Sequence, residues 1–597
     1  MGFDKVMVAN RGEIAVRIFR TLRELGLGCV AVYSDADRGR QHAEVADEAY
    51  RIGPGPAAES YLLVDVLVET ALRSGAGAVH PGYGFLAENA VFAQAVEDAG
   101  LVWIGPPPSA IELMGSKTAA RTAMREAGVP IIPGATKPVE SVDEILALGA
   151  EVGYPLIVKA AAGGGGKGMK LVEAPEEAEK AYESAQREGL KFFADASVYV
   201  ERYLVDPRHV EVQVLADGHG NVIHLGERDC TIQRRHQKLI EETPSPGVSD
   251  ELRARIGQIG VDAARAAGYR SAGTIEGLLT AEGQYYFMEM NTRIQVEHTV
   301  TEEVTGLDLV REQVMVALGH PLSVTQEQVQ LRGHAFECRI NAEDVAAGFL
   351  PAPGLITAYH EPSGPGVRVD SGVRAGDEIS GLYDPMIAKL IVRDTNRETA
   401  RKRMLRALEE FVIGGPPTLI GFHRAMLQHP GFIAGETCHG AAESEEIAAQ
   451  ATAYEQELAA KAAALTTASG NGAASRAVDR LVAVEVDGRS FDVRLHVPEA
   501  PWAESARRHA EREQGLSSGA GGAIVSPMQG TVLKVGVEIG QEVHPGHVVA
   551  IVEAMKMENE VVAHAAGVVD SVSVAVGQGV SNGQVICVVT TDGAIPE

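Results

Sequence analysis

The stretch Glu553-Ala554-Met555-Lys556-Met557-Glu558-Asn559 lies where two copies of one sequence pattern meet. The segment 526–553 is repeated without a gap as 563–590, because three of its glycines return 37 residues later, Gly530 as Gly567, Gly540 as Gly577 and Gly546 as Gly583. Each copy alternates apolar and polar residues between glycines, which is typical of short strands joined by turns. The repeat predicts a small β-sandwich of two related halves, with Lys556 exposed on the hairpin that links them.

A charge displayed at the symmetry point of a rigid domain is typical of a handle for covalent modification. Ala554-Met555-Lys556-Met557 resembles the signature of the biotinyl (biotin carboxyl carrier) domain. The resemblance implies that a biotin protein ligase attaches biotin to Lys556 and that residues 523–593 form a mobile carrier domain. The alternatives are a lipoyl domain, whose lysine does not normally lie between two methionines, and an ordinary surface lysine.

Length and composition place the chain among soluble proteins of several domains. It has 597 residues, 45% of them apolar, and a net charge of −28, which argues against nucleic acid or an anionic membrane as the main partner. Its five cysteines show no CxxC spacing and suggest a reducing compartment. No targeting signal or membrane-spanning run is evident, so we expect a cytoplasmic protein.

The N-terminal residues predict a parallel sheet. An apolar strand at 5–10, a helical pattern at 13–25 and a second strand at 29–33 form a βαβ unit. The turn between the first strand and the helix lacks the G-x-G-x-x-G pattern of nicotinamide-binding folds.

A glycine-rich segment between two predicted strands is a candidate phosphate-binding loop. Gly163, Gly164, Gly165 and Gly166 separate a strand ending at Lys159 from a strand at 169–172. Backbone N–H groups of such a loop can approach an anion closely. A flexible linker is the alternative interpretation.

Three polar residues predict a metal site on a β-hairpin. Glu289 and Asn291 are two residues apart on one strand and therefore share a face, and Glu276 lies on the preceding strand across a short turn. Two carboxylates and an amide oxygen suit Mg²⁺. A solvated hairpin face would show similar residues.

Residues 1 to about 450 resemble the biotin carboxylase of the ATP-grasp superfamily. The motifs that carry the resemblance are 9–13, 80–89, 159–168, 207–211, 227–230, 233–238, 289–297, 337–341 and 383–386. The expected fold is α/β and multidomain: an N-terminal parallel domain (1–114), an ATP-grasp domain (115–330, lid about 130–204) and a C-terminal domain (331–450). A tether with a short β-hairpin (451–522) and the all-β biotinyl domain (523–593) would follow.

The resemblance also implies a role for individual residues. The ATP-binding set is Lys117, Lys159, the glycine loop, Glu201, Leu204, His209, Gln233, His236 and Leu278. Glu276, Glu289 and Asn291 would hold Mg²⁺ or Mn²⁺. Bicarbonate would meet Lys238, Arg293, Gln295 and the Val296 backbone, Glu297 would deprotonate it, and Arg339 would stabilise the ureido enolate of biotin.

Two positions depart from the family pattern without touching these roles. Thr299 stands where the family usually has proline, and Gly277 follows the metal glutamate where an aromatic residue is common. The resemblance implies the α subunit of an acetyl- or propionyl-CoA-type carboxylase, working in a hetero-oligomer with a carboxyltransferase β subunit. The alternatives are the equivalent subunit of a split pyruvate carboxylase and an inactive biotin carrier.

Overall fold

The computed structural model describes residues 2–135, 137–160, 169–193, 197–235, 237–468, 477–486, 489–498, 522–526, 530–554, 557–580 and 584–590. These residues belong to two compact units, 1–470 and 471–597. Three predicted sites, the glycines 163–166, His236 and Lys556, lie outside the described residues.

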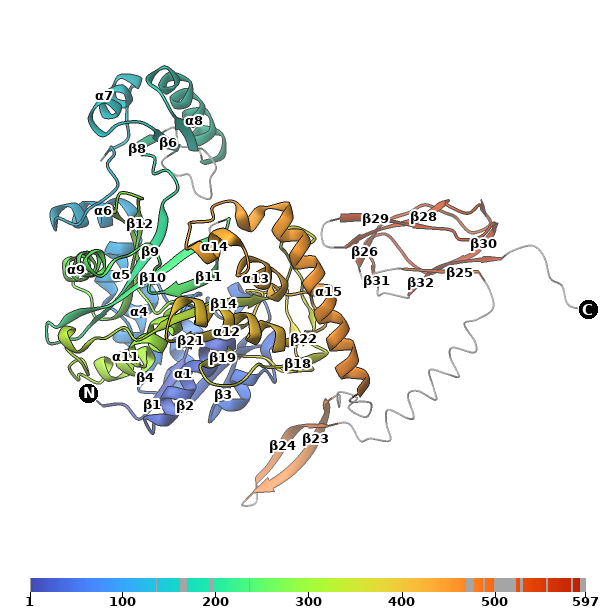
Figure 1. The fold of residues 1–597 in the computed structure, drawn as a ribbon. Helices are drawn as coiled ribbons and strands as arrows, with labels where there is room; N and C mark the ends of the chain where they lie inside the picture. The colour runs from blue at the N-terminus through green and yellow to red at the C-terminus, as the bar shows by residue number, and fades with distance from the viewer. Residues whose placement is uncertain are drawn as a thin grey trace, which may run out of the picture. The chain divides into compact units, whose positions relative to one another are not determined.

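The first unit begins with a five-stranded parallel sheet in the order β3-β2-β1-β4-β5 (Figure 1). Its strands are β1 (Lys5–Val8), β2 (Gly28–Ser34), β3 (Glu48–Gly53), β4 (Ala78–His80) and β5 (Val102–Trp103). Both faces are covered, because Val6 and Val8 pack with α1 (Gly12–Glu24) while Met7 packs with α3 (Val64–Arg73) and α4 (Ala90–Asp98). Burial on both faces explains the continuous apolar strands, and the predicted parallel α/β fold is confirmed.

An eight-stranded antiparallel sheet forms the centre of the first unit, in the order β13-β12-β9-β10-β11-β14-β21-β19. Its strands are β9 (Arg208–Ala216), β10 (Val222–Arg234), β11 (Gln237–Thr243), β12 (Ser271–Leu279), β13 (Tyr285–Asn291), β14 (His334–Asn341), β19 (Val367–Ser371) and β21 (Met386–Asp394). Helices α9 (Asp250–Ala266), α10 (His298–Thr305) and α12 (Arg397–Glu410) pack against it. The sheet brings together strands that are far apart in the chain.

A smaller three-stranded sheet, β7-β6-β8, carries the glycine-rich segment. It consists of β6 (Leu156–Ala160), β7 (Met169–Val172) and β8 (Val198–Arg202), with α7 (Val142–Val152) and α8 (Ala178–Phe193) (Figure 1). Its core is separate and includes Ile145, Val158, Val172 and Val200. The strands predicted on either side of the glycine-rich segment, β6 and β7, pair antiparallel.

A long helix, α15 (Glu445–Ala468), closes the first unit. It crosses residue 450, the expected boundary between the C-terminal domain and the tether. Ala451 and Leu458 are buried in the same core as α13 (Ile420–Met426). No helix in the described ranges is long and apolar enough to cross a bilayer.

The second unit contains a hairpin and a β-sandwich. The predicted hairpin is formed by β23 (Ala477–Val486) and β24 (Arg489–Pro498), with Val486 paired to Arg489. The sandwich consists of two four-stranded sheets, β25-β32-β30-β27 and β29-β28-β26-β31. Their strands are β25 (Ala523–Val525), β26 (Gly530–Val535), β27 (Glu542–Val543), β28 (Val548–Ala554), β29 (Met557–Val562), β30 (Gly567–Val572), β31 (Gly579–Val580) and β32 (Val585–Thr590).

The sequence repeat is a structural repeat. The offset of 37 residues carries β26 onto β30 and β27 onto β31, and it carries the start of β28 onto the start of β32. Corresponding strands occupy corresponding positions in the two sheets, which enclose one apolar core that includes Val532, Val552, Val569 and Ile586. Each half supplies two strands to one sheet and one strand to the other, so neither half forms a complete sheet alone and the halves bury their apolar faces together.

Candidate active site

The predicted metal residues meet on the β12–β13 hairpin. Glu276 lies directly opposite Glu289, and the Asn291 amide donates a 2.8 Å hydrogen bond to Glu276. Burial raises the pKa of Glu289, and the facing Glu276 charge raises it further. A divalent cation would relieve this repulsion, so the donor set fits Mg²⁺.

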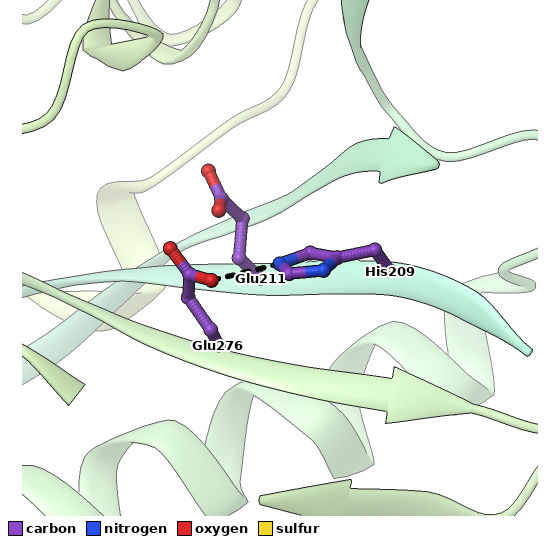
Figure 2. A group of neighbouring side chains, drawn as sticks. All are labelled: His209, Glu211 and Glu276. Atoms are coloured by element: carbon purple, nitrogen blue, oxygen red, sulfur yellow. Dashed lines mark hydrogen bonds and ion pairs between the residues drawn. The ribbon is translucent and has the colours of Figure 1, made fainter. Parts of the chain in front are cut away.

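A histidine and a further carboxylate extend this group (Figure 2). His209 Nε2 is 2.9 Å from Glu276 Oε2, and ligand atoms of His209, Glu211 and Glu276 all lie within 4.8 Å of one another. The sequence placed His209 with the nucleotide and assigned no role to Glu211. The strand register explains the meeting, because Glu211 pairs with Glu276 and His209 with Leu278 across β9 and β12.

Lys238 is the cation on which three carboxylates converge. Its ammonium donates to Glu211 at 2.5 Å, to Glu276 at 2.8 Å and to Glu297 at 2.7 Å, and its side chain is 11% exposed. Burial alone would lower the pKa of Lys238, but the three carboxylates outweigh it and raise the pKa well above its ordinary value. Lys238 therefore stays charged, and the three carboxylates take all three of its N–H donors.

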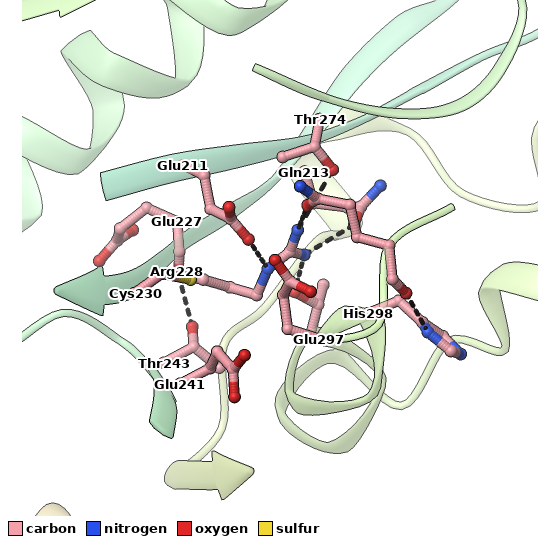
Figure 3. Close-up of polar contacts among 12 residues, drawn as sticks. Glu211, Gln213, Glu227, Arg228, Cys230, Glu241, Thr243, Thr274, Glu297 and His298 are labelled. Atoms are coloured by element: carbon pink, nitrogen blue, oxygen red, sulfur yellow. Dashed lines mark hydrogen bonds and ion pairs between the residues drawn. The ribbon is translucent and has the colours of Figure 1, made fainter. Parts of the chain in front are cut away.

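A fully buried arginine, Arg228, lies among the polar residues of the site (Figure 3). Arg228 donates to Glu211 at 2.6 Å and to Gln295 at 2.6 Å. Its remaining N–H groups reach Gln213, Thr274 and Thr301. All five guanidinium donors thus have partners, which fixes the orientation of Gln295 and Glu211.

Glu297, the predicted base, lies between two cations. Lys238 and Arg339 hold its two oxygens at 2.7 and 2.9 Å, and its side chain is 2% exposed. Burial opposes its ionisation, but Lys238, Arg339 and Arg228 hold the pKa of Glu297 well below its ordinary value. Arg339 is in turn oriented by Glu241, which accepts from its Nε at 2.6 Å.

Arg293 and Gln295 lie on the segment between β13 and α10. Arg293 donates to Asn291 at 2.7 Å and to Glu88 at 3.0 Å. Gln295 donates to Glu276 at 2.6 Å. The two predicted bicarbonate ligands are therefore tied to the metal residues on one side and to the N-terminal domain on the other.

The described residues of the predicted nucleotide set fall into separate groups. Lys159 and Arg121 both contact the Glu201 carboxylate in the lid. Leu204 is buried after β8, Leu278 is half-buried on β12, and Gln233 donates to the Cys230 carbonyl at 2.8 Å. Lys117 is exposed at the start of α6 (Lys117–Glu126). Of this set, Lys159 and Glu201 contact each other directly, and the other residues lie on separate elements.

Both departures from the family pattern have a local explanation. A Cβ on Gly277 would lie 2.4 Å from the Tyr285 ring, so the aromatic group is supplied from across the hairpin. Thr299 Oγ1 donates to the buried Glu337 carboxylate, a hydrogen bond that proline could not make.

The small β7-β6-β8 sheet, the carboxylate hairpin and the cation-bound Glu297 define an ATP-grasp ligase that is joined to a carrier domain. The family models that match are "Biotin carboxylase, N-terminal domain" at 2–111, "Carbamoyl-phosphate synthase L chain, ATP binding domain" at 116–325, "Biotin carboxylase C-terminal domain" at 337–442 and "Biotin-requiring enzyme" at 522–589.

Curated relatives extend the match. The biotin carboxylase of Nostoc sp. is 53% identical over 435 residues, which cover 73% of this chain and 97% of the relative. The biotin-dependent acyl-coenzyme A carboxylase alpha3 subunit of Mycobacterium leprae is 45% identical over 571 residues, 94% of each chain. A pyruvate carboxylase subunit of Methanothermobacter thermautotrophicus is 52% identical over 434 residues, 73% of this chain and 88% of the relative.

Solved structures agree with these relatives. The biotin carboxylase subunit of a pyruvate carboxylase has 46% identity and a TM-score of 0.69, covering 75% of this chain and 99% of its own. The biotin carboxylase domain of Hydrogenobacter thermophilus 2-oxoglutarate carboxylase, in complex with MgADP, ADP and bicarbonate, has 45% identity and a TM-score of 0.68, with the same coverage. The chain belongs to the biotin carboxylase family and combines this ATP-dependent enzyme with a biotin-requiring carrier domain. The predicted cofactors biotin, ATP and Mg²⁺ are confirmed.

Sequence patterns alone did not reveal four residues that organise the site: Glu88, Glu211, Arg228 and Glu241. The first three lie in the motifs 80–89, 207–211 and 227–230, so membership of a motif was the available signal. Glu241 lies in none of the motifs, and the pairing of β11 with β14 is what places it beside Arg339.

Proposed function

We propose that this chain is the α subunit of a biotin-dependent acyl-CoA carboxylase. It would carboxylate biotin attached to its own Lys556 by a biotin protein ligase, and a separate carboxyltransferase β subunit would pass the carboxyl group to an acyl-CoA. The observation that carries the proposal is the match to the Mycobacterium leprae alpha3 subunit, which spans 94% of both chains. The match to the Methanothermobacter pyruvate carboxylase subunit covers 73% of this chain, so a split pyruvate carboxylase is the second candidate.

The site residues take the roles that their chemistry suits. Glu276, Glu289 and Asn291 would hold Mg²⁺, which supplies positive charge to the ATP phosphates. Lys238, Arg293 and Gln295 would bind bicarbonate, and Arg339 would act on the biotin ring. The nucleotide would contact Lys117, Lys159, Glu201, Leu204, His209, Gln233, Leu278, His236 and the glycines 163–166.

Glu297 would act as the general base, and its surroundings suggest how it becomes basic enough. While Lys238 and Arg339 hold it, the pKa of Glu297 is well below its ordinary value. A bound bicarbonate would take hydrogen bonds from the same cations, weaken their hold on Glu297 and raise its pKa. The bicarbonate proton would then move to Glu297 while a bicarbonate oxygen attacks the γ-phosphorus of ATP and ADP leaves.

The compartment and the partner follow from the chemistry of the chain. All five cysteines are unpaired, four of them buried, which supports a reducing, cytoplasmic location. The residues assigned above account for ATP, Mg²⁺, bicarbonate and biotin. None of them is assigned to an acyl-CoA, and the proposal gives that step to a carboxyltransferase partner.

A transfer assay tests the proposal. The purified biotinylated chain, given labelled bicarbonate and MgATP, should carry label on its biotin and leave acetyl-CoA and propionyl-CoA unlabelled. Adding a carboxyltransferase β subunit should move the label into an acyl-CoA, and a Lys556→Ala chain should carry no label. Labelled malonyl-CoA or methylmalonyl-CoA from the chain alone would refute the division of labour. Discharge to pyruvate, and not to acyl-CoA, would favour the second candidate.

A further inference from the structure

Lys389 is a buried cation that none of the roles above uses. It lies on β21 and its side chain is 0% exposed. Its ammonium donates to the Val296 carbonyl at 2.9 Å and lies 3.3 Å from Glu13 Oε1. An ammonium ion is expensive to bury, so a position of this kind calls for a specific reason.

Three separate parts of the first unit meet at this ammonium: α1 of the N-terminal domain, the segment between β13 and α10, and β21 itself. Glu13 comes from the first turn of α1 in the N-terminal domain, and the Tyr83 hydroxyl donates to the same Glu13 oxygen. Lys389 lies 5.8 Å from the Tyr83 ring centroid. The loop after β19 packs tightly here, because a Cβ on Gly372 would lie 2.4 Å from the Glu13 nitrogen.

Surrounding carboxylates keep Lys389 charged. Burial alone would lower its pKa, but Glu13, Glu337 and Asp370 outweigh burial and raise it. Within the described residues, Glu13 Oε2 and Glu337 Oε1 are buried without a hydrogen-bond partner. Burial raises the pKa of Glu337 well above its ordinary value and that of Glu13 to about 7, whereas Arg368 and Lys389 outweigh burial and lower the pKa of Asp370, so Asp370 supplies the firmest negative charge. The Lys389 ammonium directs its hydrogen bond to the Val296 backbone.

The Val296 carbonyl belongs to the peptide unit that leads into Glu297. Residues on both sides of it are fixed by their side chains, Gln295 by Arg228 and Glu297 by Lys238 and Arg339. Lys389 holds the backbone between them. We propose that Lys389 is a positioning residue that fixes the Val296 carbonyl and so sets where the Glu297 carboxylate meets bicarbonate; this rests on the proposed role of Glu297 as the base.

Lys389→Met tests the proposal in the full biotinylated chain. We expect turnover in bicarbonate-dependent ATP cleavage to fall roughly 10–100-fold, because a small misplacement of a reacting group can cost about that much. The KM for ATP should not change, since the contacts of Lys389 include none of the proposed nucleotide residues that the structure describes. Amide hydrogen exchange of residues 296–298 should become faster. Lys389→Arg, which keeps a charged donor, should recover part of the turnover.

Arg401→Met is the matched control. Arg401 is also a buried cation that donates to a backbone carbonyl, that of Leu427 at 2.8 Å, and it pairs with Glu398 at 2.8 Å. The Arg401→Met chain should be less stable than the unmodified chain. Its turnover should not fall, and amide hydrogen exchange at residues 296–298 should not become faster. If Lys389→Met does not fold, the double variant Lys389→Met with Glu13→Gln removes the ammonium together with one facing charge, and the same kinetic result is expected.

The outcomes distinguish the proposal that Glu297 is the general base from the proposal that Lys389 positions it. Glu297→Gln serves as the reference: if it keeps full turnover, the base assignment fails. If Glu297→Gln is inactive while Lys389→Met, or the double variant, turns over like the unmodified chain, Lys389 is not a positioning residue. An equal loss in Arg401→Met, or an effect confined to the KM for ATP, would also overturn the proposal.

Discussion

Replacing Glu297 by glutamine is the sharpest perturbation of the proposed mechanism. The amide is nearly isosteric with the carboxylate but cannot accept the bicarbonate proton. Loss of a general base reduces turnover by about 10²–10⁴-fold. ATP binding should barely change, because Glu297 contacts Lys238 and Arg339 and, among the described residues, none of the proposed nucleotide set.

The contacts of Glu297 also indicate how much the Glu297→Gln substitution should lower the free energy of unfolding. Removing one partner of a buried ion pair typically costs about 3–5 kcal/mol, because the other charge is left unpaired. Here Lys238 keeps Glu211 and Glu276, and Arg339 keeps Glu241. Neither cation is left unpaired, so we expect the free energy of unfolding to fall by less than about 3 kcal/mol.

The assay separates chemistry from binding and folding. Bicarbonate-dependent ADP release measures turnover, calorimetric titration with MgATP measures nucleotide affinity, and thermal unfolding measures stability. Glu303→Gln is the control, because Glu303 lies on α10 close to Glu297 but is 26% exposed and pairs with Arg368. A Glu297→Gln chain that lost nucleotide affinity, or kept full turnover, would refute the reasoning.

Two further predictions concern the carrier and pH. Residues 523–597 expressed with a biotin ligase should fold and bind streptavidin, and Lys556→Ala should abolish that binding without unfolding the sandwich; persistent labelling would contradict the assignment. Burial, opposed by Arg339 and supported by Glu297, raises the pKa of Glu241 from 4.5 to about 7. The folded state therefore binds this proton more tightly than the unfolded chain, so this group's contribution to stability falls as pH rises from about 4.5 to about 7. Glu241→Gln should make the dependence of the melting temperature on pH shallower between about pH 4.5 and pH 7, and an unchanged slope would contradict the raised pKa.

Local patterns in the sequence were sufficient to predict several features of the structure. The 37-residue repeat predicted the two halves of the sandwich, because each half exposes an apolar face that only its copy covers. Spacing along one hairpin was enough to predict that Glu276 lies beside Glu289, since a β-hairpin pairs residues close in sequence. One βαβ unit was enough to predict the parallel N-terminal sheet, because its two strands are also close in sequence.

The tertiary structure alone decided how the charges around Glu297 are shared. Lys238 meets carboxylates from β9, β12 and the segment before α10, and Lys389 reaches Val296 from 93 residues away. Such meetings depend on the order and register of the eight-stranded sheet, which no local periodicity encodes. Burial then strengthens the electrostatic interaction in each of these contacts. In a dry interior these cations hold Glu297 ionised, whereas in water the same charges would be screened from one another.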